Sequence, residues 1–146
     1  YLVMNIGAFG CILLMKRDGK YIEEINELSG ISKNHPLISL GFLVILFSLA
    51  GIPPLAGFFA KFYIFMSVIE SNMFTLAIVG LVTTVISAFY YIRIIKVMYF
   101  DDPKKSFERF TDYRIHGPII ISCILLISFF LYPSFLNDIV SKIIIF

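Results

Sequence analysis

Residues 51–57 read Gly-Ile-Pro-Pro-Leu-Ala-Gly and interrupt an apolar run that extends from Pro36 to Ile69. The two prolines have no N–H to donate to the carbonyls of Leu49 and Ala50, so a continuous α-helix would lose two hydrogen bonds here. About 20 apolar residues already cross the hydrocarbon core of a bilayer. A run of this length therefore predicts either two short spans or one span that is interrupted at 51–57.

The composition indicates the medium in which this run lies. Of the 146 residues, 59% are hydrophobic and 15% are charged, whereas an ordinary soluble domain has about 25% charged residues. The mean hydropathy is +0.91. Eight charges fall between Lys16 and Lys33 and eight more between Asp101 and Arg114, which leaves long uncharged stretches. The sequence therefore predicts an integral membrane protein of the all-α class.

We predict a single membrane domain over residues 1–146, a helix bundle with about four transmembrane helices, the second one discontinuous. Pro118 is expected to be the first residue of the last helix, where a missing N–H costs little. Around four spans are few for a transport fold, so we expect partner chains. The spans are expected at 1–15, at 37–69 with the break at 51–57, at 74–99 and at 118–136.

The distribution of basic residues favours one interrupted span over two short ones. With one interrupted span, both charged loops and the Arg93 and Lys96 region lie on the same side, which then holds ten of the 12 Lys and Arg residues. Two short spans would divide these residues almost evenly. Because basic residues accumulate on the inner side of a membrane, we expect the charged loops inside and both termini outside.

Lys61 is the candidate for chemistry. It lies four residues after Gly57 and nine residues before Glu70, too far along a helix for its side chain to reach the membrane boundary. A lysine near the bilayer centre costs about 2.5 to 3.5 kcal/mol on insertion scales. Desolvation disfavours its charged form, and so does the expected position in the first turn of the second half-helix. We predict a buried proton carrier; a structural ion pair or a hydrogen bond to the freed carbonyls is the open alternative.

A polar stripe in the third span is the second candidate feature. Thr84, Ser87 and Tyr91 share one face of a helix, and we predict that they line a possible water path to Lys61. Hydroxyls that simply bond backbone or a neighbouring helix are the alternative.

Several classes of site are not expected. Cys11 and Cys123 lie in apolar runs without a nearby His or Cys at ligand spacing, so neither a metal site nor a disulfide is expected. The chain has no Gly-rich phosphate loop, and its net charge of +2 is too evenly mixed for nucleic acid.

The motif around the break resembles a known family. Residues 48–63, Ser-Leu-Ala-Gly-Ile-Pro-Pro-Leu-Ala-Gly-Phe-Phe-Ala-Lys-Phe-Tyr, resemble the signature of the antiporter-like membrane subunits of respiratory complex I, and residues 87–96 and 5–9 support the likeness. Phe62 is similar to the residue after the lysine in the subunit 2 branch, NADH dehydrogenase subunit 2. The resemblance implies that the chain matches the C-terminal four helices of such a subunit. It also implies that Lys61 is the lysine of a broken helix in a half-channel for protons, whose break includes Gly51, Pro53, Pro54 and Gly57.

The same resemblance implies a function. The chain would be a core membrane-arm subunit of NADH:ubiquinone oxidoreductase that contributes to proton translocation. NADH, FMN, iron–sulfur clusters and ubiquinone would be bound by other subunits. Expected partners are other membrane-arm subunits of complex I, a separate chain that supplies the missing N-terminal helices, and lipids, but not nucleic acid. Abundant isoleucine and 16 phenylalanines favour the mitochondrial inner membrane, with the charged loops on the matrix side and both termini toward the intermembrane space.

Two alternatives remain open. The chain could belong to a related multi-chain Na⁺/H⁺ antiporter, whose family shares the broken helix and the lysine. It could also be a structural remnant that fills the membrane arm without pumping.

Overall fold

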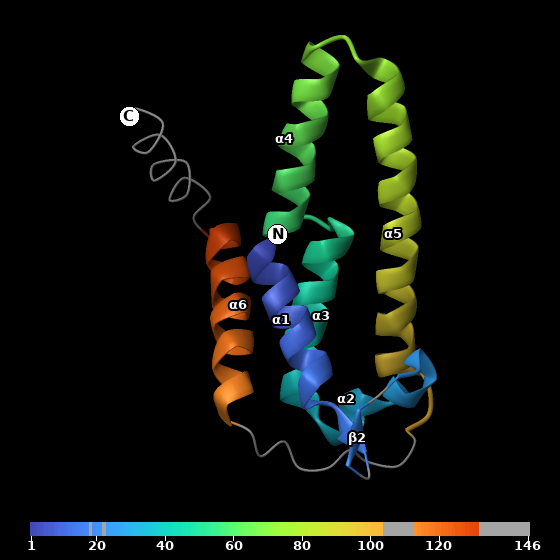
Figure 1. Ribbon diagram of the computed structural model, residues 1–146, viewed down its shortest axis with the longest axis vertical. Helices are drawn as coiled ribbons and strands as arrows, with labels where there is room; N and C mark the ends of the chain where they lie inside the picture. Colours follow the sequence, from blue (N-terminus) through green and yellow to red (C-terminus); the bar gives the residue numbers. More distant parts are fainter. Residues whose placement is uncertain (18, 22, 104–112, 132–146) are drawn as a thin grey trace.

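The chain folds into helices, as expected for the all-α class. A computed structural model describes residues 1–17, 19–21, 23–103 and 113–131 (Figure 1). Two-residue strands pair antiparallel, with Lys16 opposite Tyr21. The elements are α1 (Leu2–Leu14), β1 (Lys16–Arg17), β2 (Lys20–Tyr21), the 3₁₀ helix η1 (Ile25–Leu28), α2 (Ile31–Asn34), α3 (Pro36–Ala50), α4 (Ala56–Glu70), α5 (Phe74–Phe100) and α6 (Tyr113–Leu131).

The core lies where α1, α3 and α6 pack together and where α3 meets the C-terminal half of α5. Its largest fully buried side chains include Phe42, Ile45 and Met98. Helix α3 therefore packs against α1, α5 and α6, while Leu37 and Leu40 near its start remain exposed. The start of α4 reaches this core at Ala56, and the ring of Phe59 packs edge-on against Phe129 of α6 at a centroid distance of 5.6 Å.

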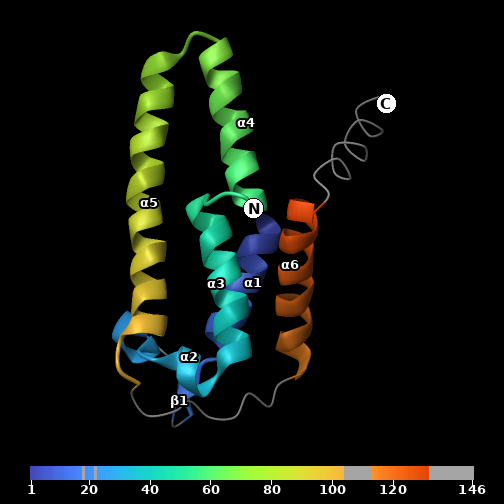
Figure 2. The ribbon, with the colours of Figure 1, turned by 180° about the vertical axis from the view of Figure 1, so that it is seen from behind.

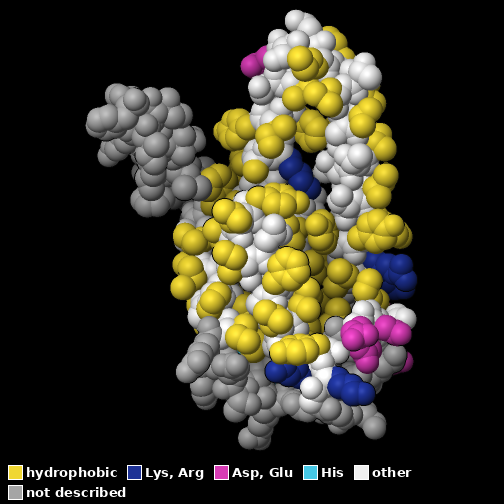
Figure 3. Space-filling model, viewed as in Figure 1, with side chains coloured by type: hydrophobic (Ala, Val, Ile, Leu, Met, Phe, Trp, Pro, Cys, Tyr) yellow, Lys and Arg dark blue, Asp and Glu magenta, His cyan; other side chains and the backbone are white. Residues whose placement is uncertain are grey.

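Helices α4 and α5 form an antiparallel hairpin that projects beyond the other helices, as both ribbon views show (Figures 1 and 2). A tight turn at Ser71, Asn72 and Met73 joins them, and Asn72 takes the left-handed conformation at φ 58°. Most large apolar side chains of this hairpin are exposed. Figure 3 shows hydrophobic side chains over most of the visible face, as a surface that contacts lipid or other apolar helices requires.

The discontinuous second helix is confirmed. Helices α3 and α4 follow each other end to end alongside α5, and the residues between them, 51–55, are not helical. The break is shorter at its far end than the predicted 51–57, because Ala56 and Gly57 already belong to α4.

The start of the last helix was predicted wrongly. Helix α6 begins at Tyr113, so Pro118 lies inside it and is not its first residue. The proline removes only the N–H that would bond the carbonyl of residue 114, in the first turn, where the helix end can still meet polar groups. Residues 132–136 of the predicted span lie outside the described residues.

By length and hydropathy, α5 is the one helix in the described ranges that could cross a membrane by itself. Helices α1 and α3 are apolar but have only 13 and 15 residues. The number of four spans therefore stays a prediction.

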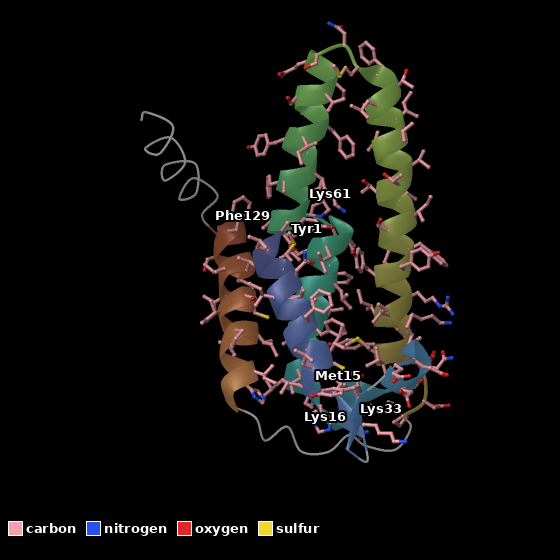
Figure 4. The ribbon with its side chains drawn as sticks, in the orientation of Figure 1. Tyr1, Met15, Lys16, Lys33, Lys61 and Phe129 are labelled. Carbon is pink, nitrogen blue, oxygen red and sulfur yellow. The ribbon has the colours of Figure 1, made fainter. Side chains whose placement is uncertain are left out.

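The first charged segment lies against the end of α5, where the second one begins. The backbone N–H of Gly30, in the first segment, donates to the carbonyl of Val97 near the end of α5 at 3.2 Å, just before the second segment begins at Asp101. Lys16 and Lys33 are both at this end, opposite the tip of the hairpin (Figure 4).

Candidate functional site

The break is built by a glycine that ends α3. Gly51 takes the left-handed conformation at φ 82°, which favours glycine because a Cβ would be strained there. Its N–H donates to the carbonyl of Ser48 at 3.0 Å, and the N–H of Ile52 donates to the carbonyl of Phe47 at 3.1 Å. This closing pattern is common at helix ends. It leaves the carbonyls of Leu49 and Ala50 for another donor.

Lys61 is that donor. Its Nζ donates to the carbonyl oxygen of Leu49 at 2.8 Å and to that of Ala50 at 3.2 Å. These are the two carbonyls whose helical partners the prolines remove. The structure therefore shows the hydrogen bond that the sequence left as an alternative to a proton carrier. We name the Lys61 ammonium and the carbonyls of Leu49 and Ala50 the lysine cradle.

Two expectations about Lys61 need correction. It is half-buried and not fully buried, because α4 projects beyond α1 and α6 and leaves one side of the lysine uncovered. It is also the sixth residue of α4, since α4 begins at Ala56, so it lies in the second turn and not in the first. The nearest helix end is the C-terminus of α3, whose partial negative charge favours an ammonium.

Ser48 is a site residue that sequence reasoning missed. It is fully buried in the last turn of α3, and its hydroxyl accepts the N–H of Gly57 at 3.1 Å and donates to the sulfur of Met4 at 3.1 Å. A Cβ on Gly57 would overlap the carbonyl oxygen of Ser48. The signal in the sequence was a serine shortly before the break, but nothing in the spacing indicated which N–H it would meet.

The polar stripe of α5 is not joined to Lys61 by a hydrogen bond in the described part of the chain. Thr84 donates to the carbonyl of Gly80 at 2.8 Å, and Ser87 to that of Thr83 at 2.9 Å, both within α5. Tyr91 is half-buried. The hydroxyls of Thr84 and Ser87 thus bond backbone, as the alternative for this stripe expects, and a water path stays a prediction.

No group of three or more His, Cys, Asp or Glu side chains that could hold a metal ion occurs among the described residues. Both cysteines are free thiols, Cys11 buried and Cys123 half-buried. Cys123 donates to the carbonyl of Gly41 at 3.6 Å and so links α6 to α3.

A family comparison agrees with the motif at the break. Residues 1–87 match the membrane domain described as NADH:quinone oxidoreductase/Mrp antiporter. This range includes α1, the whole broken helix and the first half of α5. The cradle and Ser48 therefore lie within the matched part of the chain.

Two curated relatives carry the same name. Subunit N of the NADH-quinone oxidoreductase from Pelagibacter ubique is 57% identical over 98% of this chain, and that from Paramagnetospirillum magneticum is 46% identical over 92%. These matches cover 30% and 28% of the two relatives, so the chain spans about 30% of their length. Both organisms are bacteria, so these relatives do not support the predicted mitochondrial location.

A solved structure shows the same fold. A chain of respiratory complex I from Thermus thermophilus with bound aureothin superposes with a TM-score of 0.74 and is 28% identical, over 92% of this chain and 31% of that chain. The resemblance found at residues 48–63 is thus confirmed by family, sequence and structure. The chain belongs to the family of membrane subunits of NADH:quinone oxidoreductase and Mrp antiporters.

Proposed function

We propose that this chain forms part of an antiporter-like membrane-arm subunit of NADH:ubiquinone oxidoreductase and contributes to proton translocation, with Lys61 as the proton carrier. The observation that carries this proposal is the lysine cradle. It holds a titratable amine at the break of an apolar helix, where α3 ends and α4 begins (Figure 4). Ionisable groups at such breaks are functional candidates because the membrane makes them expensive.

The cradle gives Lys61 two states with different contacts. As an ammonium, Lys61 donates to two carbonyls, and such charge-assisted bonds are roughly twice as strong as neutral ones. As a neutral amine, Lys61 can donate only the weaker, uncharged hydrogen bonds. It also loses the favourable interaction of its charge with the C-terminus of α3. A charge that approaches from a neighbouring subunit shifts the balance between these states, so that Lys61 takes up a proton from one side and releases it toward the other.

The membrane placement forms part of the same proposal. Residues 1–146 form one membrane domain, in which α3 and α4 together make the second of four spans. The charged end carrying Lys16 and Lys33 faces the matrix, or the cytoplasm in a bacterium, and both termini face the opposite side. Lys61 then lies far from both aqueous surfaces. Thr84, Ser87 and Tyr91 are the hydroxyls that we propose along its water path.

Partners follow from the open side of Lys61. A half-exposed lysine at this depth does not face lipid, because hydrocarbon offers it no acceptor. We propose that helices equivalent to the remaining length of the relatives cover this side, and a separate chain that supplies them stays our prediction. NADH, FMN, iron–sulfur clusters and ubiquinone are proposed to bind other subunits of the complex.

The proposal is tested by replacing Lys61 in the assembled complex. Lys61→Met removes the titratable amine, so we expect fewer protons translocated per NADH oxidised while NADH is still oxidised. Lys61→Arg keeps a donor for the carbonyls but holds its proton at all physiological pH values, so it should also lower the proton yield. Proton uptake into sealed vesicles, measured together with NADH oxidation, gives the ratio.

Lys96→Met is the matched control, because Lys96 is exposed near the charged end of α5. An unchanged ratio in Lys61→Met would contradict the carrier role and favour a structural remnant. A normal ratio in Lys61→Arg with a lowered one in Lys61→Met would mean that Lys61 serves only to bond the carbonyls.

A Na⁺/H⁺ antiporter is the second candidate, because the matching family description includes the Mrp antiporter. Purification of the chain with its native partners separates the two functions. NADH oxidation by the purified assembly supports the first, and Na⁺-driven proton exchange without NADH oxidation supports the second.

A further inference from the structure

We propose that Ser48 is a positioning residue for Lys61: from the end of α3 it caps the start of α4 and so holds the lysine over the carbonyls of Leu49 and Ala50. This inference rests on the proposed function, because it assigns to Ser48 the placement of the proton carrier. It concerns a side chain that contacts neither the ammonium nor either cradle carbonyl by a hydrogen bond in the described part of the chain.

The first step is the missing cap of α4. The first N–H groups of a helix have no acceptor within the helix and need one from outside. Leu55, the residue before α4, has no hydrogen-bonding side chain. The N–H of Gly57 finds its acceptor in the hydroxyl of Ser48, at 3.1 Å. Ser48 thus does for α4 what a serine at the N-cap position normally does, although it comes from the preceding helix.

The second step is the close contact of the two backbones. Because a Cβ on Gly57 would overlap the carbonyl oxygen of Ser48, the first turn of α4 lies directly on the last turn of α3. Ser48 is fully buried, so water does not compete for its hydroxyl. The hydrogen bond and the close backbone contact therefore both restrain where the start of α4 lies against the end of α3.

The third step ties this junction to the bundle. The hydroxyl of Ser48 donates its hydrogen to the sulfur of Met4, at 3.1 Å, while it accepts the N–H of Gly57. Met4 belongs to α1 and is itself buried. One hydroxyl therefore links α1, α3 and α4, so that the position of α4 is set against two helices and not only one.

The last step connects Ser48 to the cradle. Leu49 and Ala50 directly follow Ser48 in α3, and Lys61 lies four residues, about one turn, after Gly57 in α4. The bond between Ser48 and Gly57 thus ties the first turn of α4 to the last turn of α3, and the ammonium of Lys61, in the next turn of α4, bonds the same end of α3. Loss of this bond frees the start of α4 to shift, and a small shift is enough to take Nζ out of hydrogen-bond distance.

The test replaces Ser48 by alanine in the assembled complex. In Ser48→Ala we expect a several-fold lower proton yield per NADH, a shifted pH profile of proton translocation, and retained NADH oxidation. Ser39→Ala is the matched control, because Ser39 is also fully buried on α3 but donates to the carbonyl of Pro36 in its own helix, at 2.9 Å. It should leave yield and pH profile unchanged. A purely structural role for Ser48 would lower the amount of assembled complex without moving the pH profile.

Ser48→Cys is a second variant that keeps the site filled but offers a weaker acceptor, and it should shift the pH profile in the same direction by less. If Ser48→Ala does not assemble, the pH profile of Ser48→Cys tests the proposal in its place. An unchanged pH profile in an assembled Ser48 variant would overturn the proposal.

A structure of the complex carrying a Ser48 variant separates this proposal from the proposed function. We expect Nζ of Lys61 to leave the carbonyls of Leu49 and Ala50. If Nζ stays within hydrogen-bond distance of both, Ser48 does not position it. If Lys61→Met leaves the proton yield unchanged, the carrier role fails, and the position of Lys61 in the Ser48 variant still decides what Ser48 does.

Discussion

At the scale of single residues, the ammonium of Lys61 completes the hydrogen bonding of a helix that two prolines leave incomplete. Each carbonyl would cost about 1–3 kcal/mol if it were buried without a donor. The cost of placing Lys61 in the membrane is therefore partly offset by the two bonds at Leu49 and Ala50. Binding the carbonyls and carrying a proton are compatible roles, because the same contact holds one protonation state more tightly than the other.

Gly51 gives a prediction at this scale. A Cβ on Gly51 would meet Cδ of Lys61 at 3.0 Å and Nζ at 3.2 Å, and the backbone has φ 82°. Gly51→Ala is therefore expected to destabilise the subunit by about 1–2 kcal/mol through backbone strain and to displace the lysine. Thermal unfolding of the assembled complex measures the first effect and the proton yield the second. Gly41→Ala is the control, since its Cβ would come no closer than 3.4 Å to Cys123. Equal unfolding temperatures for both variants would contradict the prediction.

At the scale of elements, the broken helix consists of two half-helices, α3 and α4, each too short to span a membrane alone. The two half-helices also pack against different neighbours. Helix α3 packs against α1, α5 and α6, whereas α4 contacts the end of α3, α5 and the end of α6 but not α1 to a comparable extent. The break lets the chain change neighbours without changing its overall direction (Figure 1). It also places a helix C-terminus and a lysine side by side in an apolar region.

The prolines give a prediction at this scale. The double variant Pro53→Ala and Pro54→Ala supplies the missing N–H groups, so we expect them to bond the carbonyls of Leu49 and Ala50 and to compete with Lys61. Hydrogen exchange of the amides at 53 and 54 should then show protection, and the proton yield should fall. Pro36→Ala is the control, because Pro36 occupies the first position of α3, where an N–H has no partner in the helix. Absence of protection at 53 and 54 would show that Gly51 alone ends α3.

At the scale of the whole molecule, polarity is divided along the long axis. Charged side chains gather mainly at the end that carries β1, β2 and η1, and exposed apolar side chains cover the hairpin (Figure 3). The contact of Gly30 with Val97 shows that two segments distant in sequence form this charged end together. Such a molecule fits a membrane in which the charged end lies at one surface.

The prediction at this scale is that the charged end and the tip of the hairpin face opposite sides of the membrane. Lys33 is exposed at the charged end, so the thiol of a Lys33→Cys variant should react with a membrane-impermeant reagent only from the inner side. Ser71 is exposed at the tip of the hairpin, so the thiol of a Ser71→Cys variant should react only from the opposite side. The protein with its two native cysteines alone serves as the control, since Cys11 is buried and Cys123 half-buried. Reaction of both new cysteines from the same side would contradict the proposed spans.

The sequence by itself determined the helical class, the break and the identity of its lysine, because these depend on local chemistry. Prolines lack an N–H wherever they stand, and apolar runs exclude charge whatever they pack against. It even named the two carbonyls that would be free. The sequence-based prediction was wrong at the start of α6. Pro118 favours the first position of a helix but lies about one turn inside this one.

Only the tertiary structure decided which groups meet across the break. Lys61 and the carbonyls of Leu49 and Ala50 are 11 to 12 residues apart, and Ser48 and Gly57 are nine apart. A helical repeat relates neighbours three or four residues apart, so it carries no information about contacts through a non-helical turn. The exposure of Lys61 depended likewise on how far α4 projects beyond the bundle. Both the contacts across the break and the exposure of Lys61 depend on the angle between α3 and α4. That angle is set by packing and not by the local sequence.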